Sequence, residues 1–225
     1  MAPKYLQTLY QNNAGSSLST VTATSTAASS KGSLGILVGR CSSAGPPANS
    51  TITDSVGNVW TLDKTAISAS AAGVYLYSAP LLVPWAVGTT VQVTFSTGII
   101  NRSVIVAEFA QANITSARLD ITGSNATTSS VTSLSATLPA QTSYGDLIIG
   151  AVATSTSQTS FTTAFSTPQM TDVTYSGLYC GLSWKVGDRS SISPTELWAA
   201  PGSVGFALAA YRPTFSGGLL TGSET

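Results

Sequence analysis

Apolar and polar residues alternate with a period of two along much of this chain. Residues 91–96 read Val-Gln-Val-Thr-Phe-Ser, and residues 133–138 read Ser-Leu-Ser-Ala-Thr-Leu. In 178–186 a Leu, a Cys, a second Leu, a Trp and a Val share one parity. This alternation predicts half-buried β-strands, and side chains of the Val, Thr and Tyr type suit a pleated surface.

Four other runs are apolar on both parities: 34–38, 104–107, 147–152 and 204–210. Such runs predict central strands, covered on one side by an opposing sheet and on the other by a loop or a neighbouring subunit. A buried helix could account for one of them. Because all four are short and lie between turn signals, strands are the better interpretation.

Turn residues recur at short intervals, among them Gly-Pro-Pro at 45–47, Gly-Asn at 57–58, Gly-Asp at 145–146 and Pro-Gly at 201–202. They divide the chain into about a dozen short strands and leave no helix, which is typical of a sandwich. The sequence therefore predicts an all-β, antiparallel β-sandwich, and more specifically a jelly roll.

The predicted sandwich domain spans 14–213. Residues 1–13 are expected to form an N-terminal arm and the Gly- and Ser-containing residues 214–225 a C-terminal tail.

A weak internal repeat also runs through the chain. The segments 35–39 and 104–109 are echoed by 147–150 and 204–211. Two similar halves would suit a jelly roll, which contains two Greek keys. Chance similarity between short apolar strands is the alternative.

The stretch 54–64, DSVGNVWTLDK, packs Asp, Gly and Asn ahead of an alternating strand. Asp54 can accept a hydrogen bond from the backbone two residues on, and Gly57 or Asn58 can supply a positive φ. These features favour the bend of a β-hairpin, with Trp60 in the core. A calcium loop is the alternative, but the spaced acidic ligands of an EF-hand are missing.

Charge is scarce: charged residues make up 8% of the chain, and 9 basic residues balance 9 acidic ones. With 43% hydrophobic residues, the chain is expected to fold around a core. The basic residues are scattered, which argues against nucleic acid as a partner. No apolar run approaches the roughly 20 residues of a membrane span, and no secretory signal begins the sequence, so we expect synthesis in a cytoplasm.

Histidine is absent, which excludes Ser-His and Cys-His catalysis and His-ligated zinc. Cys41 and Cys180 lie far apart in sequence and outside any metal-ligand spacing. We interpret them as buried free thiols, with a single disulfide as the alternative. No cofactor and no metal are expected.

Paired carboxylates are the remaining catalytic option. Glu108 is conspicuous because it lies in an apolar strand, where an ionised group is costly unless it is paired. We expect Arg102, Arg118 or backbone amides to satisfy it, and we expect no enzyme; a glycan-degrading enzyme using Glu108 is the catalytic alternative. The other candidate acids are Asp120, Asp146, Asp172 and Glu196.

Four aromatic residues in or near turns are candidate contacts for a subunit interface or a glycan: Trp85, Trp198, Tyr175 and Tyr179. Exposed rings of this kind stack on sugars, and Trp and Tyr are equally enriched at protein interfaces. Trp60 and Trp184 are assigned to the core instead.

Several segments together resemble a β-sandwich family common among virion proteins of tailed phages. They are 35–38, 52–61, 76–80, 88–95, 106–109, 145–150 and 209–213. The resemblance covers about residues 16–213, and related modules also occur in secreted bacterial proteins. It implies a jelly roll with no catalytic residue that packs against other virion subunits.

From this resemblance we expect a non-enzymatic structural protein on the exterior of a virion, either a capsid decoration protein or a minor tail protein. It would be assembled in the host cytoplasm, with other capsid or tail subunits as partners and as a homo-oligomer. The alternative is a carbohydrate-binding β-sandwich module that attaches to a host-surface glycan or a polysaccharide.

Overall fold

The computed structural model describes residues 4–9, 18–41, 51–68, 72–99, 103–110, 119–158, 161–163, 169–172 and 178–212. Every regular element in these ranges is a β-strand, which confirms the all-β prediction. Within the same ranges, no helix of the length and apolar character needed to cross a membrane is found.

There are fourteen strands in the described part of the chain. They are β1 (Lys4–Leu9), β2 (Leu18–Thr24), β3 (Leu34–Cys41), β4 (Thr51–Asp54), β5 (Thr61–Ser68), β6 (Ala72–Pro80), β7 (Thr90–Ile99), β8 (Ser103–Ala110), β9 (Leu119–Ser135), β10 (Leu147–Gln158), β11 (Phe161–Thr163), β12 (Gln169–Asp172), β13 (Leu178–Val186) and β14 (Thr195–Tyr211).

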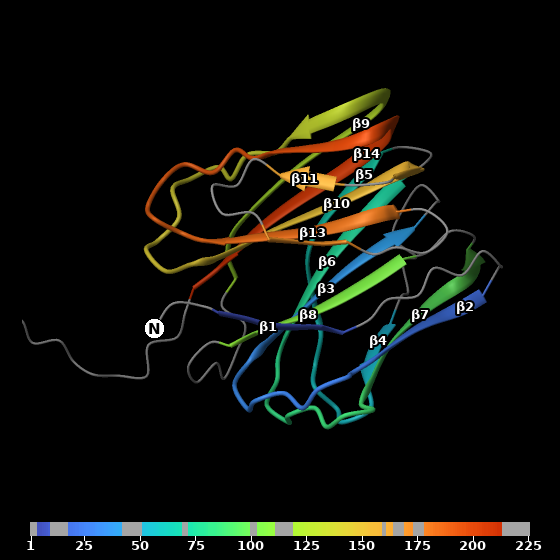
Figure 1. The fold of residues 1–225 in the computed structure, drawn as a ribbon, viewed down its shortest axis with the longest axis vertical. Helices are drawn as coiled ribbons and strands as arrows, with labels where there is room; N and C mark the ends of the chain where they lie inside the picture. Colours follow the sequence, from blue (N-terminus) through green and yellow to red (C-terminus); the bar gives the residue numbers. More distant parts are fainter. Residues whose placement is uncertain are drawn as a thin grey trace, which may run out of the picture.

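The strands form three antiparallel sheets, stacked with sheet I between the other two (Figure 1). Sheet I has the order β1-β8-β3-β6-β5, sheet II the order β2-β7-β4, and sheet III the order β11-β14-β10-β13-β12, with β9 also paired to β14. This arrangement confirms the β-sandwich. A jelly roll has eight strands in two sheets, connected as two Greek keys. The sheets of this chain hold five, three and six strands. The jelly roll itself therefore stays a prediction.

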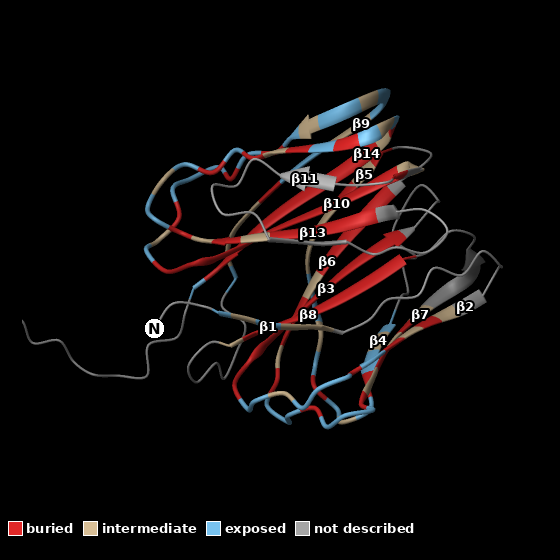
Figure 2. Ribbon diagram, viewed as in Figure 1, coloured by how far each residue is buried: buried red, intermediate tan, exposed pale blue. Residues whose placement is uncertain are grey.

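Packing on both faces of the central strands explains why the runs 34–38, 104–107, 147–152 and 204–210 are apolar on both parities. In β3, Leu34, Ile36 and Val38 face sheet III, while Leu37 faces sheet II, and all four are fully buried. Figure 2 shows the same continuous burial along the strands at the centre of the stack. The second face of β3 and β8 is therefore covered by sheet II. The second face of β10 and β14 is covered by Ile192 and by apolar residues of 131–138.

The weak internal repeat corresponds to a repeat of structure. Leu34 of β3 lies opposite Pro80 of β6 and Phe109 of β8. Leu147 of β10 lies opposite Val186 of β13 and Tyr211 of β14. The two central strands therefore stand in the same register between their two neighbours.

The turns that precede these strands also match. Gly32 and Gly145 have positive φ values of 85° and 84°. The Gly32 amide donates to the Leu81 carbonyl and the Leu81 amide to the Ser33 carbonyl, at 3.0 and 2.8 Å. In the second half, the Gly145 amide donates to the Gly187 carbonyl at 3.0 Å, and the Gly187 amide to the Asp146 carbonyl at 2.7 Å.

The correspondence extends to every strand, because each of the two long strands, β9 and β14, occupies the positions of two strands of the first half. The first part of β9, up to Thr127, takes the place of β1 beside its partner, and the part from Val131 takes the place of β2. β14 likewise combines the positions of β7 and β8. We call residues 4–110 the N-terminal repeat and 119–211 the C-terminal repeat; their large sheets pack face to face.

Within the segment expected to be an arm, residues 4–9 form β1, which pairs with β8 at the edge of sheet I. The other residues of that segment and the predicted tail 214–225 lie outside the described residues.

Candidate functional site

The stretch 54–64 is a corner between two sheets and not the hairpin we expected. β4, which ends at Asp54, pairs with β7 in sheet II, whereas β5, which begins at Thr61, pairs with β6 in sheet I. No ladder of hydrogen bonds joins β4 to β5, so the polar groups of the corner need other partners. Side chains from the corner itself supply them.

The Asp54 carboxylate is the centre of that corner. Its Oδ1 accepts from the amides of Val56 and Asn58, each at 3.0 Å. Its Oδ2 accepts from Asn58 Nδ2 at 2.8 Å and from Trp85 Nε1 at 3.1 Å. Four protein donors therefore surround this carboxylate, which accounts for the Asp without a metal.

Asn58 connects the corner to the loop that follows β6. Its Nδ2 donates to the Val83 carbonyl and its Oδ1 accepts from the Val83 amide, both at 2.9 Å. The Trp85 ring stacks on Trp60 at 6.4 Å between centroids, and the Trp85 amide donates to Ser29 Oγ at 2.6 Å. These contacts hold residues 55–60 and 82–88 as one unit, which we call the N-tip.

The outer surface of the N-tip is apolar. Val59 and Val87 are 76% and 69% exposed, and Leu82 and Val83 are 48% and 45% exposed. Pro84 and Ala86 between them are exposed as well, and neither segment contains a charged residue. An exposed apolar surface on a firmly held loop is typical of an interaction site. Sequence reasoning missed it, although a turn written LLVPWAVG, with apolar residues where polar ones are usual, was the available signal.

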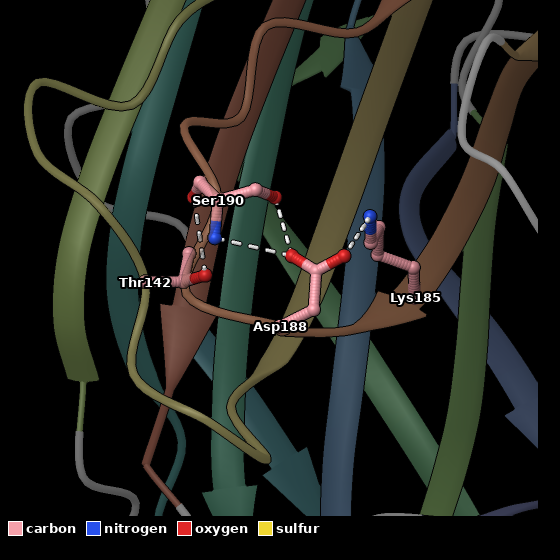
Figure 3. Close-up of polar contacts among 4 residues, drawn as sticks. All are labelled: Thr142, Lys185, Asp188 and Ser190. Atoms are coloured by element: carbon pink, nitrogen blue, oxygen red, sulfur yellow. Dashed lines mark hydrogen bonds and ion pairs between the residues drawn. The ribbon is translucent and has the colours of Figure 1, made fainter.

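The equivalent loop of the C-terminal repeat, residues 187–191, is polar; we call it the C-tip. Lys185 Nζ lies 3.5 Å from Asp188 Oδ2, and Asp188 Oδ1 accepts from the amide of Ser190 at 3.1 Å and from its hydroxyl (Figure 3). The Ser190 hydrogen bonds lower the pKa of Asp188. Thr142 Oγ1 donates to the Ser190 carbonyl at 3.5 Å, and Arg189 has a positive φ of 66°.

The aromatic candidates do not form an exposed row. Trp85 is 1% exposed and Trp198 is 6% exposed, and Trp198 Nε1 donates to the Val131 carbonyl at 2.7 Å. Both rings are buried within the chain, so neither presents an open face to a glycan or a partner. Tyr175, and the side chain of Tyr179 on β13, lie outside the described residues.

Glu108 is fully buried, and a backbone amide, as we expected, and a glutamine side chain, which we did not expect, donate hydrogen bonds to it. Its Oε2 accepts from Gln7 Nε2 at 2.5 Å and its Oε1 from the Ser30 amide at 3.2 Å. Arg102 and Arg118 lie outside the described residues.

Two of the other predicted acids lie close together. Asp120 forms an ion pair with Arg212 at 2.8 Å and contributes to the raised pKa of Asp146, whose main cause is burial. Asp146 Oδ2 accepts from the Ser143 amide at 2.6 Å, and its Oδ1 has no hydrogen-bond partner in the described structure. The Asp120–Arg212 ion pair and the Asp146 hydrogen bond together hold the end of β14 next to the base of the C-tip.

The remaining candidates are dispersed. Glu196 is buried on β14, where its Oε1 accepts from Ser183 Oγ at 2.7 Å. The side chain of Asp172 is not among those described. Cys180 is a buried free thiol whose pKa burial raises to about 12, while the side chain of Cys41 lies outside the described residues.

One contact that the sequence did not suggest joins the two repeats. The Tyr211 hydroxyl on β14 donates to Asp63 Oδ2 on β5 at 2.6 Å. Burial raises the pKa of Asp63 and that of Tyr211. The hydrogen bond fixes one side of the interface between the repeats.

Among the described side chains, no three acidic or cysteine residues converge as metal ligands. No family model, curated protein or solved structure matches the chain. The geometry of the tips is therefore the main ground for a functional argument.

Proposed function

We propose that this chain is a non-enzymatic structural protein on the exterior of a bacteriophage virion, as a capsid decoration or minor tail protein. The resemblance of its strand and turn segments to virion β-sandwiches supports the virion setting. The observation that carries the mode of action is the N-tip, a firmly held loop pair whose outward side chains are apolar.

The N-tip is suited to packing against another subunit because its backbone is already fixed. Asp54, Asn58 and Trp85 hold both of its segments by side-chain hydrogen bonds. Burying apolar surface contributes about 25 cal/mol per Å2, and a preorganised loop loses little conformational entropy on binding. The matching partner is an apolar surface on another capsid or tail subunit.

The carbohydrate-binding alternative loses the two rings that motivated it, since Trp85 and Trp198 are buried. Stacking on a sugar needs exposed aromatic faces, and the exposed surface of the N-tip is aliphatic. We therefore advance the structural function alone.

The test is incorporation into particles. Virions that contain the chain are compared by quantitative mass spectrometry with virions made from the variant Leu82→Ser, Val83→Ser, Val87→Ser. We expect at least a tenfold loss of incorporation at an unchanged unfolding temperature, because the three side chains are largely outside the core.

Leu197→Ser is the matched control, since Leu197 is an exposed leucine, at 45%, in the other repeat. It should leave incorporation unchanged. Absence of the chain from purified particles, or normal incorporation of the triple variant, would contradict the proposal.

A further inference from the structure

β1 is the edge strand of sheet I and pairs with β8 along one side. We call the surface that it covers, which includes Glu108, Phe109 and Trp184, its groove. We propose that this groove also accepts β1 from a second copy of the chain, so that copies join by exchanging this strand. The proposal concerns self-association in solution and does not depend on the virion function.

The groove has an aromatic part that recognises Tyr5. The Tyr5 ring meets Phe109 edge-on at 5.8 Å and stacks on Trp184 of sheet III at 6.2 Å. Phe109 and Trp184 also touch each other, at 5.6 Å. Tyr5 is therefore held by both repeats at once, and its removal would uncover two large rings.

The groove has a polar part that recognises Gln7. Gln7 Nε2 donates to the buried Glu108 carboxylate at 2.5 Å and lies 3.4 Å from the Ala27 carbonyl. A bulge between Tyr5 and Gln7 lets the first face sheet III and the second face Glu108. An empty groove would leave this carboxylate without its side-chain donor, which is costly for a buried charge.

The two repeats differ in how this strand is attached. In the C-terminal repeat the equivalent strand is the first part of β9, which continues directly into the strand that follows. In the N-terminal repeat β1 and β2 belong to different sheets and are joined by residues 10–17. Eight residues span at most about 27 Å when extended. β1 therefore has a separate connection to the next strand, which its counterpart in the C-terminal repeat lacks.

A second copy is the occupant that the groove fits best, because each copy carries the same Tyr5 and Gln7. Exchange reproduces every contact of the closed chain without creating a new one, which makes it a low-cost route to association. In an ordered array the local concentration of neighbouring copies would favour it further.

The experiment traps the exchanged strand with a disulfide. One full-length chain carries Gln7→Cys and another Glu108→Cys, both in a background of Cys41→Ser and Cys180→Ala, and the two are refolded together. Residues 7 and 108 are paired across the strands, at a Cα separation that a disulfide can bridge. We expect a covalent heterodimer on a non-reducing gel.

Two controls make the result decisive. Both cysteines in one chain of natural length should form an internal disulfide. Leu6→Cys in place of Gln7→Cys should form no heterodimer, because Leu6 lies in the bulge and is 40% exposed. An internal disulfide in the first control without any heterodimer in the mixture would overturn the proposal.

A second measurement needs no engineered cysteine. By size-exclusion chromatography with light scattering, the full-length chain should form a dimer after refolding at high concentration, and Tyr5→Ala should lower the dimer affinity at least tenfold. A full-length chain that remains monomeric would refute strand exchange.

Discussion

The N-tip and the C-tip occupy the same place in two copies of one strand arrangement, yet they present opposite surfaces. Both follow a strand that pairs with the central strand of its sheet, and both are closed by the same pair of backbone hydrogen bonds. The N-tip ends in exposed Val, Leu and Pro side chains, whereas the C-tip ends in an ion pair and a serine-capped carboxylate.

The difference shows that backbone register places a loop but does not decide its surface. In the N-tip the polar side chains point inward: Asp54 and Asn58 are buried and hold the backbone. In the C-tip the acid lies on the outside: Asp188 is exposed and bonded to Ser190 and Lys185 of the same loop region. A loop held from inside leaves its outside free for apolar residues, and that arrangement suits an interface.

The largest expected effect comes from removing Asp54, which holds the N-tip from beneath, compared with removing Asp188 of the C-tip. Asp54→Ala leaves four donors without their acceptor in a buried corner, at about 1–3 kcal/mol for each unsatisfied buried group; allowing for relaxation, we expect a loss of about 3–5 kcal/mol. Asp188→Ala removes an exposed ion pair and should change stability by no more than about 0.5 kcal/mol. Urea unfolding of both variants measures the contrast.

Equal losses in the two variants would mean that the Asp54 network does not organise the N-tip. Asp54→Asn is a useful intermediate, because an amide keeps one acceptor oxygen and should recover part of the stability.

The acids at the base and at the top of the C-tip should respond to pH with opposite signs. Burial raises the pKa of Asp146, so its contribution to stability is greatest when it is protonated and is lost as the pH rises through the raised value. Hydrogen bonds from Ser190 lower the pKa of Asp188, so its contribution is present above the ordinary carboxyl pKa and is lost as the pH falls.

In the unchanged protein, the free energy of unfolding should decline as the pH rises above the ordinary carboxyl pKa, and Asp146→Asn should remove that decline. It should also decline, by less, as the pH falls below that value, and Asp188→Asn should remove this second decline. Urea unfolding between pH 2.5 and 7 checks both slopes. Asp120 and Arg212, which face Asp146, remain in both variants, so an unchanged slope in Asp146→Asn would assign the pH dependence to that ion pair instead.

The period-two pattern was sufficient to predict the strands, and along residues 91–93 the alternation directly reflects which face is buried. In β13 it does not, because Ser183 and Lys185 are buried as well as Leu182. It was not sufficient to predict the layers. The run 34–38 indicated that both faces are covered, but the covering sheets are set by long-range pairings. In sheet II, for example, the partners on β2 and β7 lie more than sixty positions apart.

The site was harder to predict for the same reason. Trp85 lies in a turn, which suggested exposure, but its indole reaches back to Asp54, thirty-one positions earlier. The corner 54–64 looked like a hairpin because its local turn chemistry is the same; only the long-range pairing of β4 with β7 shows that it changes sheets. Local signals gave the turn residues correctly and their partners wrongly.

The smallest expected effect concerns one residue with a positive φ in each tip. Gly88 has a φ of 88° with open space around it, so Gly88→Ala meets backbone strain alone, and we expect a loss of about 1 kcal/mol. Arg189 already bears such strain at a φ of 66°; Arg189→Gly relieves it but adds entropy to the unfolded chain, so a gain of at most about 0.5 kcal/mol remains. For a chain of this size the changes correspond to shifts of only a few degrees in the melting temperature, which differential scanning calorimetry resolves. A loss of stability in Arg189→Gly would show that the arginine side chain stabilises the C-tip. Side chains would then hold the C-tip in place as they hold the N-tip.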